Sequence, residues 1–107
     1  MKTWKTPQLK NLSQVLVDID SQKIMLALLR DLCTLEELEV LARRWEAAQL
    51  IDQNIPYRTI AARTGLSTAT VTRIAHWLHY GQGGYRAVIQ QANNSILTVQ
   101  NTKKKIT

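Results

Sequence analysis

The spacing of apolar and polar positions predicts helices throughout the chain, and no alternating stretch is long enough to predict strands. Apolar residues recur at helical intervals, and residues that cap or end helices stand between many of these runs. Six helical segments are predicted, at about 7–20, 22–32, 35–53, 57–64, 68–80 and 85–91. Residues 93–107 are polar and contain three consecutive lysines. We therefore expect an all-α chain with a mobile basic tail, the alternative being a basic arm that contacts phosphate.

The first three predicted helices carry more apolar surface than one short chain can cover. Every residue from Ile24 to Leu29 is apolar, and a helix without a polar face is buried on all sides. The segment 35–53 has an apolar stripe that is broader than one packing neighbour needs. A chain of 107 residues fits one compact domain with a modest core, here residues 1–92. We therefore expect residues 7–53 to bind a partner chain.

In residues 57–80, the spacing of apolar, small and glycine positions is that of two helices that meet at a tight turn. Gly65 can take the left-handed conformation that ends the first helix, and Ser67 can cap the second. The positions that must be apolar or small are suitably filled, by Ile60, Ala61, Leu66, Val71 and Ile74. Thr64 is off-pattern, because an apolar residue often stands there. The offsets predict a helix-turn-helix, whose second helix enters the major groove of DNA.

Charge is distributed unevenly along the chain. Residues 1–53 contain seven Lys or Arg and eight Asp or Glu, whereas residues 54–107 contain seven Lys or Arg and no acid. The two parts therefore carry −1 and +7, which sum to the net charge of +6. An acid-free half is typical of a polyanion-binding surface, although a solvated basic face has the same composition.

The outward residues of the motif fit contacts with duplex DNA. Hydroxyls can bond base edges or phosphates, and alanine or threonine methyl groups can contact the thymine methyl group. The residues expected near the bases are Ser67, Thr68, Ala69, Thr70 and Thr72. The residues expected at phosphates are Arg58, Arg63 and Arg73, and Thr59 completes the DNA-binding set. The alternative is a helix-turn-helix that grips an acidic partner protein and does not bind DNA.

No pattern in the chain supports catalysis, a metal site or a membrane span. His76 and His79 have a spacing that can hold a metal, but further ligands do not stand near them in the sequence. No Ser-His-Asp or Cys-His arrangement has supporting spacing, and the longest apolar run is too short to cross a bilayer. The single cysteine, Cys33, suits a reducing compartment. We expect a cytoplasmic protein that is not an enzyme and holds no metal.

Between Thr34 and Arg73 the chain resembles the Trp repressor superfamily. The resemblance rests on a capping box at Thr34 and Glu37, the LARRW segment, the glycine turn and the STATVTR segment. The ending HYGQGGY at 79–85 is similar to that of the short bacterial Trp repressor-like branch. The resemblance implies an all-α homodimer with intertwined helices and two recognition helices about 34 Å apart. It also implies a sequence-specific transcriptional regulator, expected to be a repressor.

The same resemblance bears on a small ligand. In the family, two arginines sandwich the indole of bound tryptophan, and these positions fall on Arg44 and Arg73. Ile74 replaces the glycine that the family needs after the second arginine, and Trp77 replaces a small polar residue. These side chains would fill the cavity, so we expect no cofactor and no co-repression by tryptophan. Three alternatives stay open. The protein binds DNA constitutively, another ligand binds between Arg44 and Arg73, or Arg44 is an ordinary surface residue.

Overall fold

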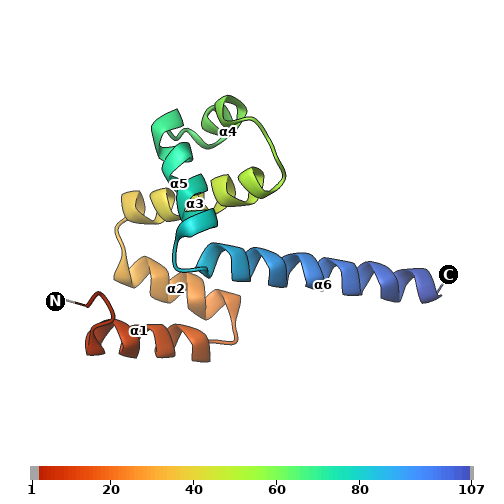
Figure 1. The fold of residues 1–107 in the computed structure, drawn as a ribbon. Helices are drawn as coiled ribbons and strands as arrows, with labels where there is room; N and C mark the ends of the chain where they lie inside the picture. Colours follow the sequence, from red (N-terminus) through yellow and green to blue (C-terminus); the bar gives the residue numbers. More distant parts are fainter. Residues whose placement is uncertain (1–2, 107) are drawn as a thin grey trace. The chain divides into compact units, whose positions relative to one another are not determined.

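The computed structural model describes the backbone of residues 3–106 and the side chains of residues 3–95. Within that range the chain is all-α, as predicted, and contains no strand (Figure 1). Its helices are α1 (Pro7–Asp18), α2 (Gln22–Leu32), α3 (Leu35–Asp52), α4 (Tyr57–Thr64), α5 (Thr68–Tyr80) and α6 (Gly84–Ile106). The chain divides into two compact units, Met1–Glu39 and Val40–Thr107, with the boundary inside α3. The single domain predicted over residues 1–92 stays a prediction. In a dimer, both units of a chain can contribute to one shared core.

α1 and α2 are short helices that begin with side-chain caps. The Leu9 backbone N–H donates to the Thr6 hydroxyl at 3.1 Å, and the Ile24 N–H donates to the Ser21 hydroxyl at 3.3 Å. No residue of either helix is buried, and Leu26 on α2 is 60% exposed. Apolar surface left in contact with water favours the predicted partner chain.

The capping box predicted at the start of α3 is present. The Glu37 backbone N–H donates to the Thr34 hydroxyl at 3.1 Å, and the Thr34 backbone N–H donates to Oε1 of Glu37 at 2.8 Å. Hydrogen bonds from the backbone and then the side chain of Thr34 hold the pKa of Glu37 below its ordinary value. The box explains why α3 begins at Leu35.

The second unit is built on the C-terminal part of α3, whose buried residues share one core with α4, α5 and α6. Its buried apolar residues are Ala47, Ala48, Leu50, Ile51, Ile60, Val71, Ile74, Ala75, Leu78 and Ile89. Trp45 lies at the edge of this core, where its ring stacks on that of Tyr85 with the centroids 6.4 Å apart. Four residues of α5 are buried in this core, and their burial fixes which face of the helix turns outward.

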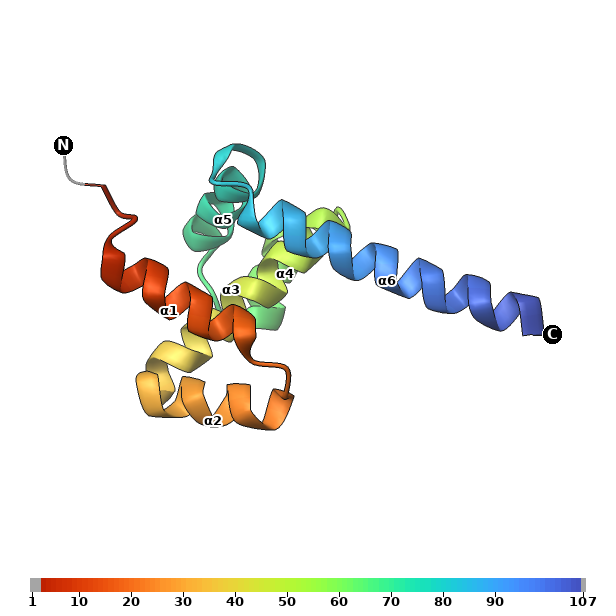
Figure 2. The same cartoon turned by 90° about the horizontal axis from the view of Figure 1, so that it is seen from below.

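α6 is longer than the sequence pattern predicts, which corrects the predicted fold. The prediction ends this helix at about residue 91, whereas the structure continues it to Ile106. Ile89 is buried in the core and Tyr85 packs against the same core, and no glycine or proline follows that would end the helix. In both views the backbone of α6 continues past α3, α4 and α5 (Figures 1 and 2). Side chains beyond residue 95 lie outside the described part, so a mobile tail and a basic arm both stay predictions.

The connection between α5 and α6 depends on Gly81. Its backbone N–H donates to the Trp77 carbonyl oxygen at 2.8 Å, and a Cβ built on Gly81 would clash with that carbonyl group. Gly81→Ala is therefore expected to lower the free energy of unfolding by about 1–3 kcal/mol. Gly84→Ala is the matched control, because a Cβ there meets nothing within 4 Å. Equal urea midpoints for the two variants would show that the connection tolerates the extra methyl group.

Candidate nucleic-acid interface

α4 and α5 are joined by a turn that both helix ends help to define. α4 ends at Gly65, whose φ of 75° lies in the left-handed region that favours glycine. The Gly65 N–H donates to the Ala61 carbonyl at 2.9 Å. Ser67 caps α5, because its hydroxyl accepts from the Thr70 backbone N–H at 3.1 Å and donates to the Thr70 hydroxyl at 2.9 Å. The predicted helix-turn-helix is therefore present (Figure 1).

The inner faces of the two helices are buried as the offsets predict. Ile60, Val71 and Ile74 are completely buried, and Ala61 and Leu66 pack against the same core. Residues three and four apart on a helix share a face, so burial of this side leaves the opposite side of α5 toward solvent.

Thr64, the off-pattern residue, is buried with its hydroxyl satisfied. Only 4% of its surface is exposed. The hydroxyl donates to the Ile60 carbonyl oxygen at 2.7 Å and accepts from the Leu66 backbone N–H at 3.3 Å. A buried polar group is tolerated when it is hydrogen-bonded. Thr64 therefore supplies a partner for a backbone N–H of the turn, which an apolar residue at this position would leave unpaired.

The outer face of α5 carries the residues predicted to lie near bases. Thr68, Ala69 and Thr72 are exposed, and Thr70 is half-buried. The Thr72 hydroxyl donates to the Thr68 carbonyl oxygen at 3.0 Å, which leaves its oxygen able to accept and its methyl group able to pack. The hydroxyls of Ser67 and Thr70 bond to each other in the cap. The predicted set therefore divides into residues that hold the helix start and residues that face solvent.

The residues predicted at phosphates lie on exposed positions of α4 and α5. Arg58 and Thr59 are in the first turn of α4, Arg63 is in its last turn, and Arg73 follows Thr72 on α5. All four of these side chains are exposed. No acidic residue occurs in the sequence after Asp52, so neither helix carries a carboxylate that would repel a phosphate.

Sequence reasoning missed a cluster of aromatic and basic side chains at the C-terminal end of α5. The rings of His76 and His79 tilt against that of Tyr80, with centroids 5.2 and 6.2 Å away. The Arg86 guanidinium donates to Nδ1 of His79 at 3.2 Å. Because a guanidinium only donates, Nδ1 of His79 is the acceptor in this contact. The four-residue spacing of His76 and Tyr80 is the signal in the sequence that points to the cluster.

The two arginines expected to clamp a ligand have different surroundings. Arg44 on α3 is half-buried, and its buried Nε has no hydrogen-bond partner among the described residues. Arg73 on α5 is exposed, the adjacent Ile74 is buried in the core, and Trp77 is 42% exposed. The two arginines therefore differ in exposure, and a ligand between them stays a prediction.

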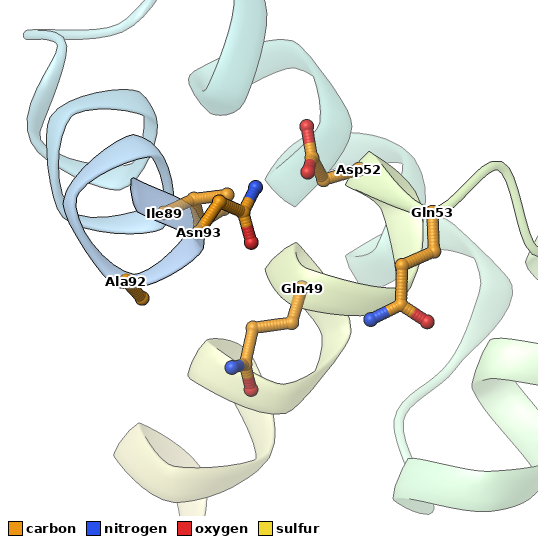
Figure 3. A pocket seen from close by; sticks show the side chains of 6 residues that line it. All are labelled: Gln49, Asp52, Gln53, Ile89, Ala92 and Asn93. Atoms are coloured by element: carbon orange, nitrogen blue, oxygen red, sulfur yellow. The ribbon is translucent and has the colours of Figure 1, made fainter. Parts of the chain in front are cut away.

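A separate pocket of about 120 Å³ lies between the end of α3 and α6. The side chains that line it belong to Gln49, Asp52, Gln53, Ile89, Ala92 and Asn93 (Figure 3). Neither Arg44 nor Arg73 is among them, so this pocket is distinct from the expected clamp. In the part of the chain that the structure describes, no three His, Cys, Asp or Glu residues gather as metal ligands would. None of the described helices is both long and apolar enough to cross a membrane.

Comparison with known proteins identifies related chains. Residues 7–93 match the family model described as Trp repressor protein. The uncharacterized protein YerC of Bacillus subtilis is 35% identical over 65 residues, which cover 61% of this chain and 62% of that protein. The chain therefore spans about three fifths of the length of this curated relative.

Two solved structures share the fold. A TrpR-like protein from Eubacterium eligens superposes with a TM-score of 0.79 and 31% identity, covering 83% of this chain and 92% of its own. A candidate Trp repressor from Staphylococcus aureus gives a TM-score of 0.77 and 28% identity, covering 83% of this chain and 89% of its own.

Proposed function

We propose, because this chain belongs to the Trp repressor family, that it is a sequence-specific DNA-binding regulator of transcription and acts as a repressor. In this proposal α5 enters the major groove of duplex DNA and α4 crosses the phosphate backbone. The protein acts as a homodimer, since two recognition helices related by a two-fold axis match a pseudo-palindromic site.

The outer face of α5 is the observation that carries the proposal. Thr68, Ala69 and Thr72 are exposed on a helix whose inner side is buried, and the start of that helix is held by the Ser67 cap. Hydroxyl and methyl groups in this position suit hydrogen bonds and apolar contacts with base edges.

Positive charge beside this face supports binding to a phosphate backbone. Arg58, Arg63 and Arg73 are exposed, and no acid follows Asp52. Arginine forms charge-assisted, often bidentate hydrogen bonds with phosphate oxygens. These residues would fix the position of the protein on duplex DNA without reading its sequence.

The exposed apolar surface of α1 and α2 supports the homodimer. Val17, Ile24 and Leu26 each expose more than half of their surface. Burial of apolar surface stabilises association by roughly 25 cal/mol per Å². A second copy of the chain would cover these side chains in the assembly that the family resemblance implies.

Tryptophan is not the effector in this proposal. Ile74 is buried directly after Arg73, and Trp77 already places an indole on the same helix. The protein would then bind its site constitutively, or respond to a smaller ligand that pairs with Nε of Arg44.

Selection of bound duplexes from a random pool, with and without added tryptophan, tests the proposal. We expect salt-dependent retention and enrichment of one pseudo-palindrome, with the same sequence and yield in both conditions. No retention of duplex at low salt would favour the alternative function, a module that grips an acidic protein. Enrichment only in the presence of tryptophan would show that the co-repressor site is intact despite Ile74.

Arg63→Ala tests the phosphate role of the α4 arginines. The variant should weaken binding to every duplex alike, because a phosphate contact carries no sequence information. The slope of log K against log salt should become less negative by about 0.9, as expected for one lost phosphate contact. Fluorescence anisotropy titrations at several salt concentrations measure both effects. An unchanged slope would remove Arg63 from the interface.

A further inference from the structure

Arg43 lies outside the helix-turn-helix in sequence but against it in space. Its guanidinium carbon is 4.0 Å from where a Cβ on Gly65 would stand, so the side chain of α3 reaches the turn between α4 and α5. The side chain is also exposed. Arg43 therefore adds a cation beside Gly65, in the turn that precedes the candidate recognition helix.

We propose that Arg43 is a further phosphate-binding residue of the DNA site, which extends the interface from the helix-turn-helix onto α3. This inference rests on the proposed function. A phosphate is the DNA group that suits this position, because the N-terminal residues of a recognition helix enter the groove while the backbone passes outside them. A guanidinium at the turn can then donate to the strand that borders the groove.

The chemistry of arginine allows Arg43 to bind a phosphate while it also makes a contact within the protein. A guanidinium has five N–H donors in a planar fork, so one protein contact leaves donors for a phosphate. Glu39 and Glu46 are the nearest acids in sequence, and both stand on α3 rather than on the two helices of the motif. Glycine at 65 adds no side chain that could shield the guanidinium from the strand.

Arg43→Gln tests the inference on the duplex selected from the random pool. We expect the salt slope to become less negative by about 0.9 and the affinity for selected and random duplexes to fall by the same factor. Arg43→Lys should largely restore the slope, because it keeps the charge. Lys10→Gln, an exposed residue of α1, removes one charge at a distance in sequence and should leave the slope unchanged.

The outcomes separate this inference from the proposed function. If the unsubstituted protein fails to bind duplex DNA at low salt, the proposed function fails and the inference falls with it. If it binds and Arg43→Gln keeps the full salt slope, the inference alone is wrong. A loss confined to the selected sequence would also overturn it, because that pattern indicates a base contact. The thermal midpoint of Arg43→Gln should match that of the unsubstituted protein, and a lower midpoint with an unchanged slope would assign Arg43 to stability alone.

Discussion

Thr68→Glu is expected to abolish detectable binding to duplex DNA while leaving the fold intact. Thr68 is the first residue of α5 and is exposed, so a carboxylate there would face the phosphates on either side of the groove. The carboxylate would repel a phosphate, and the hydroxyl that contacts a base would be lost. We expect these two effects together to lower the affinity for the selected duplex at least about a hundredfold. Anisotropy titration measures this directly.

The fold should survive because an acid suits the start of a helix. A negative charge in the first turn interacts favourably with the helix dipole, typically by about 0.3–1 kcal/mol. The thermal midpoint of Thr68→Glu should therefore be equal to or above that of the unsubstituted protein. Thr68→Gln is the matched neutral variant and should retain most of the non-specific, salt-dependent binding. Undiminished binding by Thr68→Glu would show that this end of α5 does not face DNA.

Leu26→Glu is expected to dissociate the proposed homodimer. Leu26 is 60% exposed in the single chain, where a charged substitution would change stability by less than about 0.5 kcal/mol. If a second copy covers Leu26, loss of each buried leucine should lower the free energy of association by roughly 1.5–3 kcal/mol. A symmetric dimer loses two such side chains. Association should then weaken at least about a hundredfold.

Sedimentation equilibrium over a range of protein concentrations measures this association. The unsubstituted protein should be dimeric, with a thermal midpoint that rises with concentration. Lys23→Glu, an exposed position on the same helix, is the control and should leave the dimer intact. A monomeric unsubstituted protein would show that the apolar surface of α1 and α2 serves another purpose.

Local signals predicted the helix starts well, because each rests on a few neighbouring residues. Ser21, Thr34 and Ser67 cap the helices that follow them, as their spacing from the next apolar run indicates. The end of α6 was predicted wrongly because no comparable signal marks it. The residues after 93 are as polar as those of a typical loop. A segment without glycine or proline can nevertheless extend a helix whose first turns are already formed and packed on the core.

Contacts between helices account for most of what the sequence did not reveal about the site. The role of Thr64 depends on a turn N–H that only the folded backbone brings to its hydroxyl. Arg43 reaches Gly65 because α3 packs beside the turn, and neither residue carries a local pattern that pairs them. Exposure of the α5 face followed from helical periodicity alone, which is why its residues could be named in advance.

At the N-terminus of α5, the side chains that hold the turn differ from the side chains that project into solvent. Ser67 and Thr64 make hydrogen bonds that hold the turn, whereas the side chains of Thr68 and Ala69 project into solvent. If α5 reads DNA as proposed, changes confined to Thr68 and Ala69 would alter the preferred sequence and leave the hydrogen bonds of the turn in place. The same pair is the rational starting point for engineering a variant with a chosen target sequence.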